Sequence, residues 1–408
     1  MIYEFGDCEL DTRRYELRRG GVVRRIEPQV FEVLALLVRE RDRVLAKEEI
    51  LDTVWGTRFV GESALTSRIK ALRQAVGDSG KHQVVVRTVH GRGYQFVAEV
   101  VERPDGTPDR DGHDDARRRA KPLPSQEIRF CTAGDGVRLA FATMGTGPPV
   151  VKAANWLSHL DYDWETTVWR HWFSELSARY RLLRYDERGC GLSDWDVDDL
   201  SFEAWVCDLE TVVDAAGIDR FALLGISQGG PVAVAYAVRH PERVSRLVLH
   251  GSFAQGRRVR ARTPEERALV EARIEMVRVG WGQPDPQYRQ MFLSRLLADG
   301  TQEEWREFDE LQRRSTSAHN AWRFQQVFAD IDITHIAPLV SVPTLIACSR
   351  REPDDVFEQS RLLASLIPGS RLLPLDSANH LLPERDPAWP HFLSELEAFL
   401  AVGEPEPA

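Results

Sequence analysis

The sequence of 408 residues contains few cysteines and no long apolar segment. Its five cysteines, Cys8, Cys131, Cys190, Cys207 and Cys348, include no close pair, which excludes a disulfide framework and leaves no spacing typical of metal ligands. No apolar run approaches the ~20 residues that a membrane-spanning helix needs, and the amino terminus lacks a signal-peptide pattern. We therefore expect a cytoplasmic protein with no membrane partner, no bound metal and no cofactor.

Acidic residues outnumber basic residues overall, but not at the start of the chain. The whole chain has 53 Lys and Arg against 63 Asp and Glu, a net charge of −10. Residues 1–100 have 17 Lys and Arg against 15 Asp and Glu. The small basic excess is therefore local to the amino-terminal part. The length suits one small and one large domain.

The most informative motif is G-x-S-x-G at residues 225–229, which follows an apolar strand and precedes a helix of small residues. In this context the motif predicts a nucleophile elbow, a sharp strand-to-helix turn that presents Ser227. Gly225 and Gly229 occupy positions where a side chain would collide with the returning backbone. The sequence therefore predicts Ser227 as a catalytic nucleophile.

An acidic residue and a histidine follow Ser227 in the chain order that a serine hydrolase of this kind uses. His380 lies in a loop between a strand pattern and a helix pattern, where a triad base belongs. The acid is expected after the preceding strand, and the count from the next helix favours Glu352. Asp354 and Asp355 are alternatives if the loop places one of them, in place of Glu352, beside the histidine. Any of these carboxylates can orient the imidazole and stabilise its cation.

Residues 128–401 resemble the α/β-hydrolase superfamily, and in particular its lid-bearing esterases, lactonases and C–C hydrolases. Besides the elbow, the resemblance rests on the D-x-R-G-x-G-x-S turn at residues 186–193 and on residues 240–251. It implies a mostly parallel, doubly wound α/β sheet. It also implies that residues 252–338, which read as helices between two core strands, form a helical lid, and that residues 402–408 are a tail.

The chain departs from the family pattern after the first core strand, where most relatives carry His-Gly and this chain has Asn155 and Trp156. An oxyanion hole needs backbone N–H groups, so the expected donors are Trp156 N–H and Gln228 N–H. The pocket is expected to be apolar and modest in size. Its candidate lining residues are Asn155, His159, Trp164, Trp322 and Phe328.

The first hundred residues follow a different pattern. Short strand patterns precede three helices, the last at residues 62–76. That helix buries one face through apolar residues at helical spacing, and its other face carries hydroxyl and cationic side chains. A two-strand unit with a glycine-containing turn closes the region at residues 84–96. The pattern predicts a small α+β domain of the winged helix-turn-helix type.

This region, residues 1–100, is similar to the winged-helix DNA-binding domain of OmpR/PhoB-type response regulators and of ToxR/CadC-type regulators. The similarity rests on R-T-V-x-G-x-G-Y-x-F at residues 87–96 and on the run at residues 68–78. It implies promoter DNA as a partner, with the third helix in the major groove and a homodimer on repeated half-sites. The candidate DNA-contacting residues are Ser63, Thr66, Ser67, Lys70, Arg73, Arg87 and Arg92.

Residues 101–127 have no apolar periodicity and are rich in Pro, Gly, Asp and Arg, which is typical of a flexible linker. We interpret the chain as a one-component transcriptional regulator that senses, with or without hydrolysis, a small apolar ester, lactone or diketone. The alternative is an active serine hydrolase that its DNA-binding domain localises or autoregulates. A third hypothesis is a sensor without turnover, in which Ser227 and His380 only bind the ligand.

Overall fold

The computed structural model describes residues 2–12, 16–20, 22–24, 26, 28–55, 62–78, 82–89, 92–103, 126–281, 283, 287–352 and 355–401. The chain divides into two compact units, Met1–Arg119 and Ala120–Ala408. Each unit is described by itself. Residues 104–125, which make up most of the expected linker, and the expected tail at residues 402–408 lie outside the described residues.

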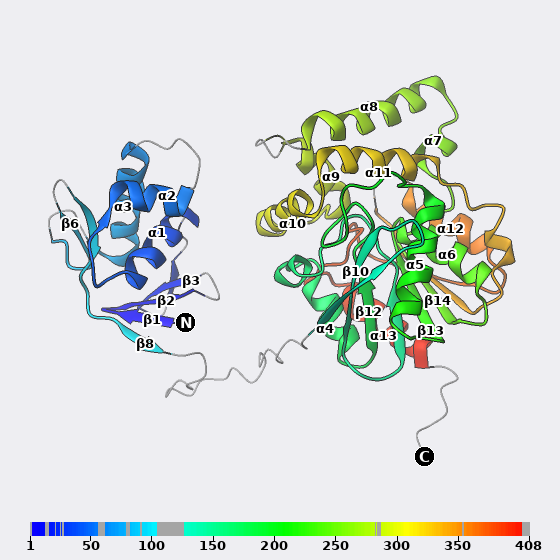
Figure 1. Cartoon of the computed structure of the whole chain (residues 1–408), viewed down its shortest axis with the longest axis horizontal. Coiled ribbons are helices and arrows are strands. Elements are labelled where there is room, and N and C mark those ends of the chain that lie inside the picture. Colours follow the sequence, from blue (N-terminus) through cyan, green and yellow to red (C-terminus); the bar gives the residue numbers. More distant parts are fainter. Residues whose placement is uncertain are drawn as a thin grey trace, which may run out of the picture. The chain divides into compact units, whose positions relative to one another are not determined.

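The first unit contains a five-stranded antiparallel sheet in the order β4-β3-β2-β1-β8 (Figure 1). The inward side chains of its strands, among them Phe5, Leu10 and Leu17, are buried. Strand β8 pairs with β1, so the sheet continues past residue 100, where we expected the linker to begin. The strands are β1 (Ile2–Phe5), β2 (Cys8–Asp11), β3 (Glu16–Arg19), β4 (Val22–Arg24) and β8 (Val101–Arg103).

Three helices share one hydrophobic core with this sheet. They are α1 (Pro28–Arg39), α2 (Lys47–Trp55) and α3 (Glu62–Val76). Helix α3 has the bounds that its apolar repeat predicted, because the repeat is its buried face. The buried residues of that repeat are Leu65, Ile69, Leu72 and Val76.

A small sheet of β5 (Leu45–Ala46), β7 (Gly93–Phe96) and β6 (Val86–Val89) completes the first unit. Gly93, with φ of 151°, lies against β5, where a Cβ atom would be 1.9 Å from the carbonyl oxygen of Leu45. Only glycine permits this approach. Three helices closed by a two-strand hairpin form the winged helix-turn-helix fold that the sequence predicted.

Strand β6 begins at Val86, two residues after residue 84, where the sequence predicted that the two-strand unit would start. The Asp78 carboxylate, just after α3, accepts the backbone N–H groups of Val84, Val85 and Val86 at 3.0, 2.9 and 2.9 Å. These donors would otherwise pair with a neighbouring strand. One buried carboxylate therefore fixes where the hairpin starts relative to the end of α3.

The second unit is built on an eight-stranded sheet in the order β16-β15-β14-β13-β11-β12-β10-β9. Strand β10 is antiparallel to both of its neighbours, and the strands from β12 to β16 run parallel. The strands are β9 (Glu127–Thr132), β10 (Arg138–Met144), β11 (Pro149–Lys152), β12 (Arg181–Tyr185), β13 (Phe221–Ile226), β14 (Val244–His250), β15 (Thr344–Ser349) and β16 (Arg371–Leu375).

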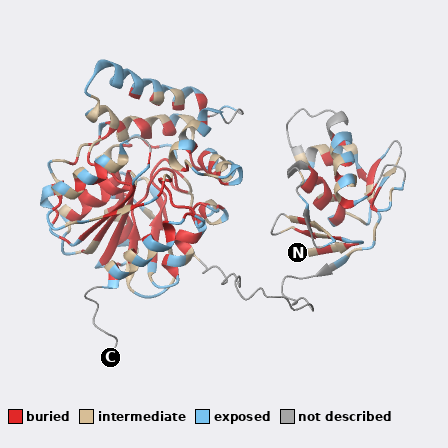
Figure 2. Ribbon diagram, turned by 180° about the vertical axis from the view of Figure 1, so that it is seen from behind, coloured by how far each residue is buried: buried red, intermediate tan, exposed pale blue. Residues whose placement is uncertain are grey.

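Helices cover both faces of this sheet, and Figure 2 shows the strands buried between them. Neighbouring residues of β13 face opposite ways: Leu223 packs with α5, α6 and α12, whereas Leu224 packs with α4 and α13. Burial on both faces explains why β13 is apolar throughout. The helices are α4 (Arg170–Ser177), α5 (Phe202–Ala215), α6 (Gly229–Arg239), α12 (Val356–Leu366) and α13 (Trp389–Ala401).

An insertion of helices lies between β14 and β15, at one end of the sheet (Figure 1). Side chains of Thr263, Thr301 and Ser317 cap three of these helices at their N-termini, which fixes where each of the three begins. The helices are α7 (Arg257–Arg260), α8 (Pro264–Gly280), α9 (Gln287–Leu296), α10 (Gln302–Ser315) and α11 (Ala318–Asp330).

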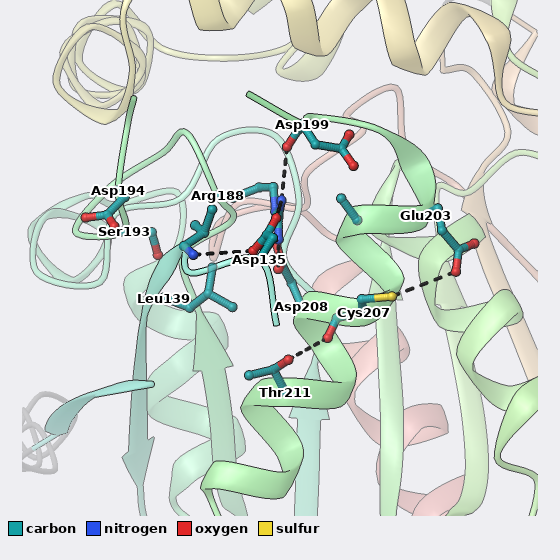
Figure 3. A network of polar contacts seen from close by, with 12 residues as sticks. Asp135, Leu139, Arg188, Ser193, Asp194, Asp199, Glu203, Cys207, Asp208 and Thr211 are labelled. Carbon is teal, nitrogen blue, oxygen red and sulfur yellow. Dashed lines mark hydrogen bonds and ion pairs between the residues drawn. The ribbon is translucent and has the colours of Figure 1, made fainter. Parts of the chain in front are cut away.

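A buried guanidinium ties the turn after β12 to the rest of the second unit. Arg188 donates to both carboxylate oxygens of Asp208 in α5, at 2.7 and 2.6 Å, and to Asp135 between β9 and β10 at 2.6 Å (Figure 3). The Arg188 and Asp208 side chains are 2% and 0% exposed. The arginine of the D-x-R-G-x-G-x-S turn thus anchors the fold and lies outside the pocket described below.

We expect Asp208→Ala to lower the free energy of unfolding of the second unit by about 3–5 kcal/mol, because it leaves a buried cation without its bidentate partner. Burial raises the pKa of Asp208 to about 6, so urea unfolding is measured at pH 8, where the wild-type carboxylate is charged. Tryptophan fluorescence follows this unit, since every tryptophan except Trp55 lies in it.

The matched control is Arg138→Ala, which breaks an exposed ion pair with Asp194 at 3.0 Å. Exposed pairs contribute at most about 1 kcal/mol. Equal losses in the two variants would contradict the anchoring role of Arg188.

Candidate functional site

Ser227 lies in a strained turn between β13 and α6. Its φ of 53° is in the left-handed region, which non-glycine residues rarely adopt. Ser227 N donates to His250 O at 2.9 Å, which holds the turn against β14. A Cβ atom on Gly229 would be 2.6 Å from the carbonyl oxygen of Ala154. The strand, turn and helix therefore have the geometry of a nucleophile elbow.

Glu352 and His380 meet in the loops that follow β15 and β16. His380 Nδ1 is in hydrogen-bond contact with Glu352 Oε1, and both side chains are buried. His380 Nε2 is also buried and has no hydrogen-bond partner among the described residues. Asp355 is the N-cap residue of α12 and has a φ of 57°, and Asp354 lies outside the described residues.

The loop that carries His380 is fixed on several sides. Asn379 Nδ2 donates to Asp386 Oδ2 at 2.8 Å, and the buried imidazole of His250 contacts His380 O through Nε2 at 2.9 Å. Burial lowers the pKa of His250 to about 3, so this ring is neutral and donates its Nε2–H. From the insertion, Leu296 O accepts His380 N–H at 3.0 Å. The histidine is therefore held by both the sheet and α9.

The predicted oxyanion donors lie together, but one of them is occupied. Trp156 N donates to the side-chain oxygen of Gln228 at 2.7 Å, and the Gln228 amide in turn donates to Glu187 Oε1 at 3.4 Å. Gln228 N lies at the N-terminus of α6, where backbone N–H groups point out of the helix. An oxyanion can reach Trp156 N–H only after the Gln228 side chain turns away.

These groups line one cavity of about 120 Å³, which contains Ser227, Gln228, Glu352 and His380. Much of its wall is apolar, as predicted. Four arginines from the insertion also line it, and the sequence did not indicate them because charged residues on helices usually face solvent. The apolar wall includes Trp156, Phe253, Val270, Ile274, Leu296 and Phe328. The arginines are Arg257, Arg260, Arg273 and Arg295.

Two of the five predicted lining residues, Asn155 and Phe328, do line this cavity, and three do not. Trp164 Nε1 donates to Gln126 Oε1 at 2.7 Å, which turns that ring away. His159 packs on the ring of Tyr162. Trp322 packs on a small cluster between α8 and α11. For His159 and Trp164, nearness in sequence to the oxyanion loop did not predict the position, because the chain bends at Trp156 and Leu157.

The residues predicted to contact DNA differ in exposure and in the partners of their side chains. Thr66, Ser67 and Lys70 are exposed on α3, and Arg92 is exposed at the turn before β7. Arg87 is exposed and donates to Gln95 Oε1 at 2.8 Å. The side chain of Ser63 lies outside the described residues.

Arg73 differs from the other predicted DNA contacts. Its guanidinium donates to Val86 O at 2.8 Å and to Thr88 Oγ1 at 2.9 Å. These bonds join α3 to β6, so the structure gives Arg73 a role in holding the hairpin against the helix.

Within the described part of the chain, no three or more His, Cys, Asp and Glu side chains are placed to hold a metal ion. In the same residues, no helix is long and apolar enough to cross a membrane.

Two protein families match separate parts of the chain. Residues 22–96 match the family described as "Transcriptional regulatory protein, C terminal", and residues 158–278 match the "alpha/beta hydrolase fold" family. The chain joins an OmpR/PhoB-type DNA-binding domain to an α/β-hydrolase domain. This finding confirms both resemblances and the predicted fold class.

Individual relatives cover one domain each. Over 90 residues, 21% of this chain and 32% of the relative, the chain is 41% identical to 2-hydroxymuconate semialdehyde hydrolase of Pseudomonas sp. strain CF600. Over 76 residues, 19% of this chain and 14% of the relative, it is 36% identical to the transcriptional regulator HilA of Salmonella typhi. The matched part is thus about a third or less of each relative's length.

Among solved structures, a hydrolase from Pseudomonas aeruginosa PA01 is similar over 67% of this chain and 98% of its own, with a TM-score of 0.57 and 23% identity. This likeness shows the fold of the hydrolase domain.

We expect Arg73→Ala and Lys70→Ala to have different effects in the winged-helix domain. Arg73→Ala removes charged hydrogen bonds to Val86 and Thr88 and should destabilise this domain by about 1–3 kcal/mol. Lys70 is exposed, and its replacement should change stability by less than about 0.5 kcal/mol. Hydrogen exchange at the backbone amides of β6 in the full chain measures both effects. Equal protection in the two variants would contradict the structural role of Arg73.

Proposed function

We propose that this chain is a cytoplasmic one-component transcriptional regulator, active as a homodimer, whose hydrolase domain binds and cleaves a small ester, lactone or diketone. The observation that carries the proposal is the cavity shared by Ser227, His380 and Glu352 in a chain that also has a winged helix. The cavity lies in the same chain as the winged helix, so the hydrolase domain is the proposed source of the input signal.

The proposed chemistry is acyl transfer through Ser227. Its hydroxyl oxygen attacks the substrate carbonyl carbon while His380 Nε2 takes the proton, and Glu352 stabilises the resulting imidazolium. Collapse of the tetrahedral intermediate passes that proton to the leaving group. A water molecule then hydrolyses the acyl-enzyme with His380 as base. The buried, unpartnered Nε2 and the Glu352 contact at Nδ1 support this assignment.

The oxyanion would be held by Trp156 N–H and Gln228 N–H. Because the Gln228 side chain bonds to Trp156 N in this structure, substrate binding must first displace it. We propose that α7–α11 act as a lid and that this displacement accompanies ligand entry. The contact between Leu296 and His380 supports a lid that is coupled to the catalytic base.

We expect a fluorophosphonate to label wild-type protein at one site, and Ser227→Ala to abolish labelling. Glu352→Gln should slow labelling by about 1,000-fold or more, since it removes the charge that favours the correct His380 tautomer and its cation. Intact-protein mass spectrometry over time measures the rate.

Asp355→Asn and Asp354→Asn are the matched controls, and neither should change the labelling rate by more than about twofold. A larger effect of either variant than of Glu352→Gln would reassign the acid. If wild-type protein is not labelled under conditions that label an ordinary esterase, this result would contradict the proposal that the protein catalyses hydrolysis.

We expect occupation of the hydrolase cavity to change affinity for DNA by about 5-fold or more, the usual range of coupling between sites. Phosphonylated and free protein are compared by fluorescence anisotropy on the DNA upstream of the gene at fixed salt, because phosphate contacts make affinity depend on salt. Ser227→Ala treated with the same reagent is the control and should behave as free protein.

An active hydrolase that is merely localised by DNA is the second candidate, and the separate compactness of the two units favours it. Equal DNA affinity with and without the adduct, across several chemically different adducts, would support this candidate and contradict the sensor.

A further inference from the structure

The side chain of Gln228, which lines the cavity beside Ser227, occupies a hydrogen-bond donor that the proposed reaction needs. Its Oε1 accepts Trp156 N–H at 2.7 Å, and both residues are buried. A backbone N–H can only donate, so Gln228 presents its oxygen to Trp156 and keeps its amino group for another partner. An oxyanion and the Gln228 oxygen therefore compete for the same N–H group.

The partner of the Gln228 amino group is a buried carboxyl that is not part of the cavity lining. Gln228 Nε2 donates to Glu187 Oε1 at 3.4 Å, and Glu187, in the turn after β12, is 2% exposed. The second oxygen of Glu187, Oε2, is buried without a hydrogen-bond partner among the described residues. Buried polar atoms are normally hydrogen-bonded. A carboxyl group with this single bond is therefore poorly explained by packing, and its contact with Gln228 indicates its role.

Glu187 accepts the Gln228 amide in either protonation state. Burial, and then the charge of Asp208, raise the pKa of Glu187 to about 8, so most of this side chain is the neutral acid at pH 7. The neutral acid keeps a carbonyl oxygen that accepts a hydrogen bond. Glu187→Gln keeps such an oxygen, whereas Glu187→Met removes it. The two variants therefore separate the hydrogen bond from the volume of the side chain.

Other contacts hold the backbone of Trp156 in place. Asn155 Nδ2 donates to Trp156 O at 3.2 Å. The Trp156 ring packs edge-on against Trp281 and Phe328, with ring centroids 5.3 and 5.7 Å away. Because these contacts do not involve Gln228, we expect a loss of its side chain to free Trp156 N–H and leave the loop in place.

From these contacts we propose that Glu187 is a positioning residue, which holds the Gln228 side chain across Trp156 N–H and keeps the oxyanion hole closed until a substrate oxygen displaces that side chain. The effect on the reaction rests on the proposed function, whereas the shielding of Trp156 N–H does not. The displacement costs free energy before Ser227 attacks, so it slows the first chemical step. A slow first step suits a sensor, because the ligand stays bound for longer before it is cleaved.

The first test is the rate at which a fluorophosphonate labels the full-length protein at pH 7. Ser227 Oγ bonds to phosphorus, fluoride leaves and His380 takes the proton, while the phosphoryl oxygen needs the same donors as an oxyanion. Gln228→Met keeps a similar volume but removes the amide acceptor. It should speed labelling about fivefold, as expected from the loss of one competing neutral hydrogen bond. Gln228→Ala is the second variant, should the first fail to fold.

The variants of Glu187 test the positioning role itself. Glu187→Met should speed labelling about twofold or more, a smaller effect because a hydrogen bond of 3.4 Å is weak. Glu187→Gln should be labelled at the rate of wild-type protein, because it keeps the acceptor. A residue that serves folding alone would slow labelling when it is replaced, or leave the rate unchanged.

Gln359→Ala is the matched control. Gln359, in α12, is another buried glutamine whose side-chain oxygen accepts a backbone N–H, that of Gln255, at 2.9 Å. Gln359 is not part of the cavity lining. Its replacement should leave the labelling rate unchanged, which shows that the loss of a buried glutamine does not by itself speed the reaction.

Hydrogen exchange at the Trp156 amide, measured without ligand, tests the shielding separately from catalysis. Exchange should be about fivefold faster in Gln228→Met and about twofold or more faster in Glu187→Met than in wild-type protein. Gln359→Ala should exchange this amide at the wild-type rate.

Each outcome decides the proposal. Faster labelling in Gln228→Met and Glu187→Met, with Glu187→Gln like wild type, supports it. The proposal is overturned if either methionine variant is labelled no faster than wild-type protein, or if Glu187→Gln is labelled as fast as Glu187→Met. If no variant reacts with the fluorophosphonate, the proposed hydrolysis is contradicted and the exchange rates decide: unchanged exchange at Trp156 in both methionine variants overturns the shielding as well.

Discussion

One buried histidine outside the proposed chemistry connects the two halves of the candidate site. His250, at the end of β14, accepts Ser227 N–H through its backbone carbonyl and contacts His380 O through its imidazole. The same residue therefore fixes the strained serine turn and the loop of the proposed base. Since burial lowers the pKa of His250 to about 3, the ring stays neutral and keeps this hydrogen bond across the pH range in which a serine hydrolase works.

The departure from His-Gly at Asn155 and Trp156 has a physical explanation in the charges beneath that loop. Lys152, buried at the end of β11, donates to Asn155 Oδ1, and Asn155 Nδ2 donates to Trp156 O at 3.2 Å. Burial lowers the pKa of Lys152 to about 8. The buried Asn155 side chain thus shapes the loop in which Trp156 occupies the position where most relatives carry glycine. The Trp156 ring packs against Trp281 and Phe328 from the insertion, so the oxyanion loop and the insertion form one packed unit.

Local patterns in the sequence predicted the fold. The features of the site that these patterns did not predict depend on contacts between segments that are distant in the sequence. Helix α3 follows from a 3.6-residue apolar period, and the elbow follows from glycines that leave no room for a side chain. By contrast, Gln228 meets Trp156 across 72 residues, and the direction of Arg273 depends on how α8 packs. No periodicity within a single segment of the sequence predicts the contact of Gln228 with Trp156 or the direction of Arg273. The residues predicted for the triad do meet in one cavity, and their catalytic roles stay predictions.

In the proposed regulator, the division into two units limits how ligand binding can change the affinity for DNA. Each unit has its own core, so filling the hydrolase cavity changes DNA affinity only through a contact outside that core. The proposed homodimer would supply such a contact, because two linked winged helices bind adjacent half-sites with an affinity set by their effective concentration. In that proposal, a modest shift in dimerisation of the hydrolase domains would produce a larger change in affinity for DNA. The insertion can produce that shift, since its helices line the cavity on one side and are exposed on the other.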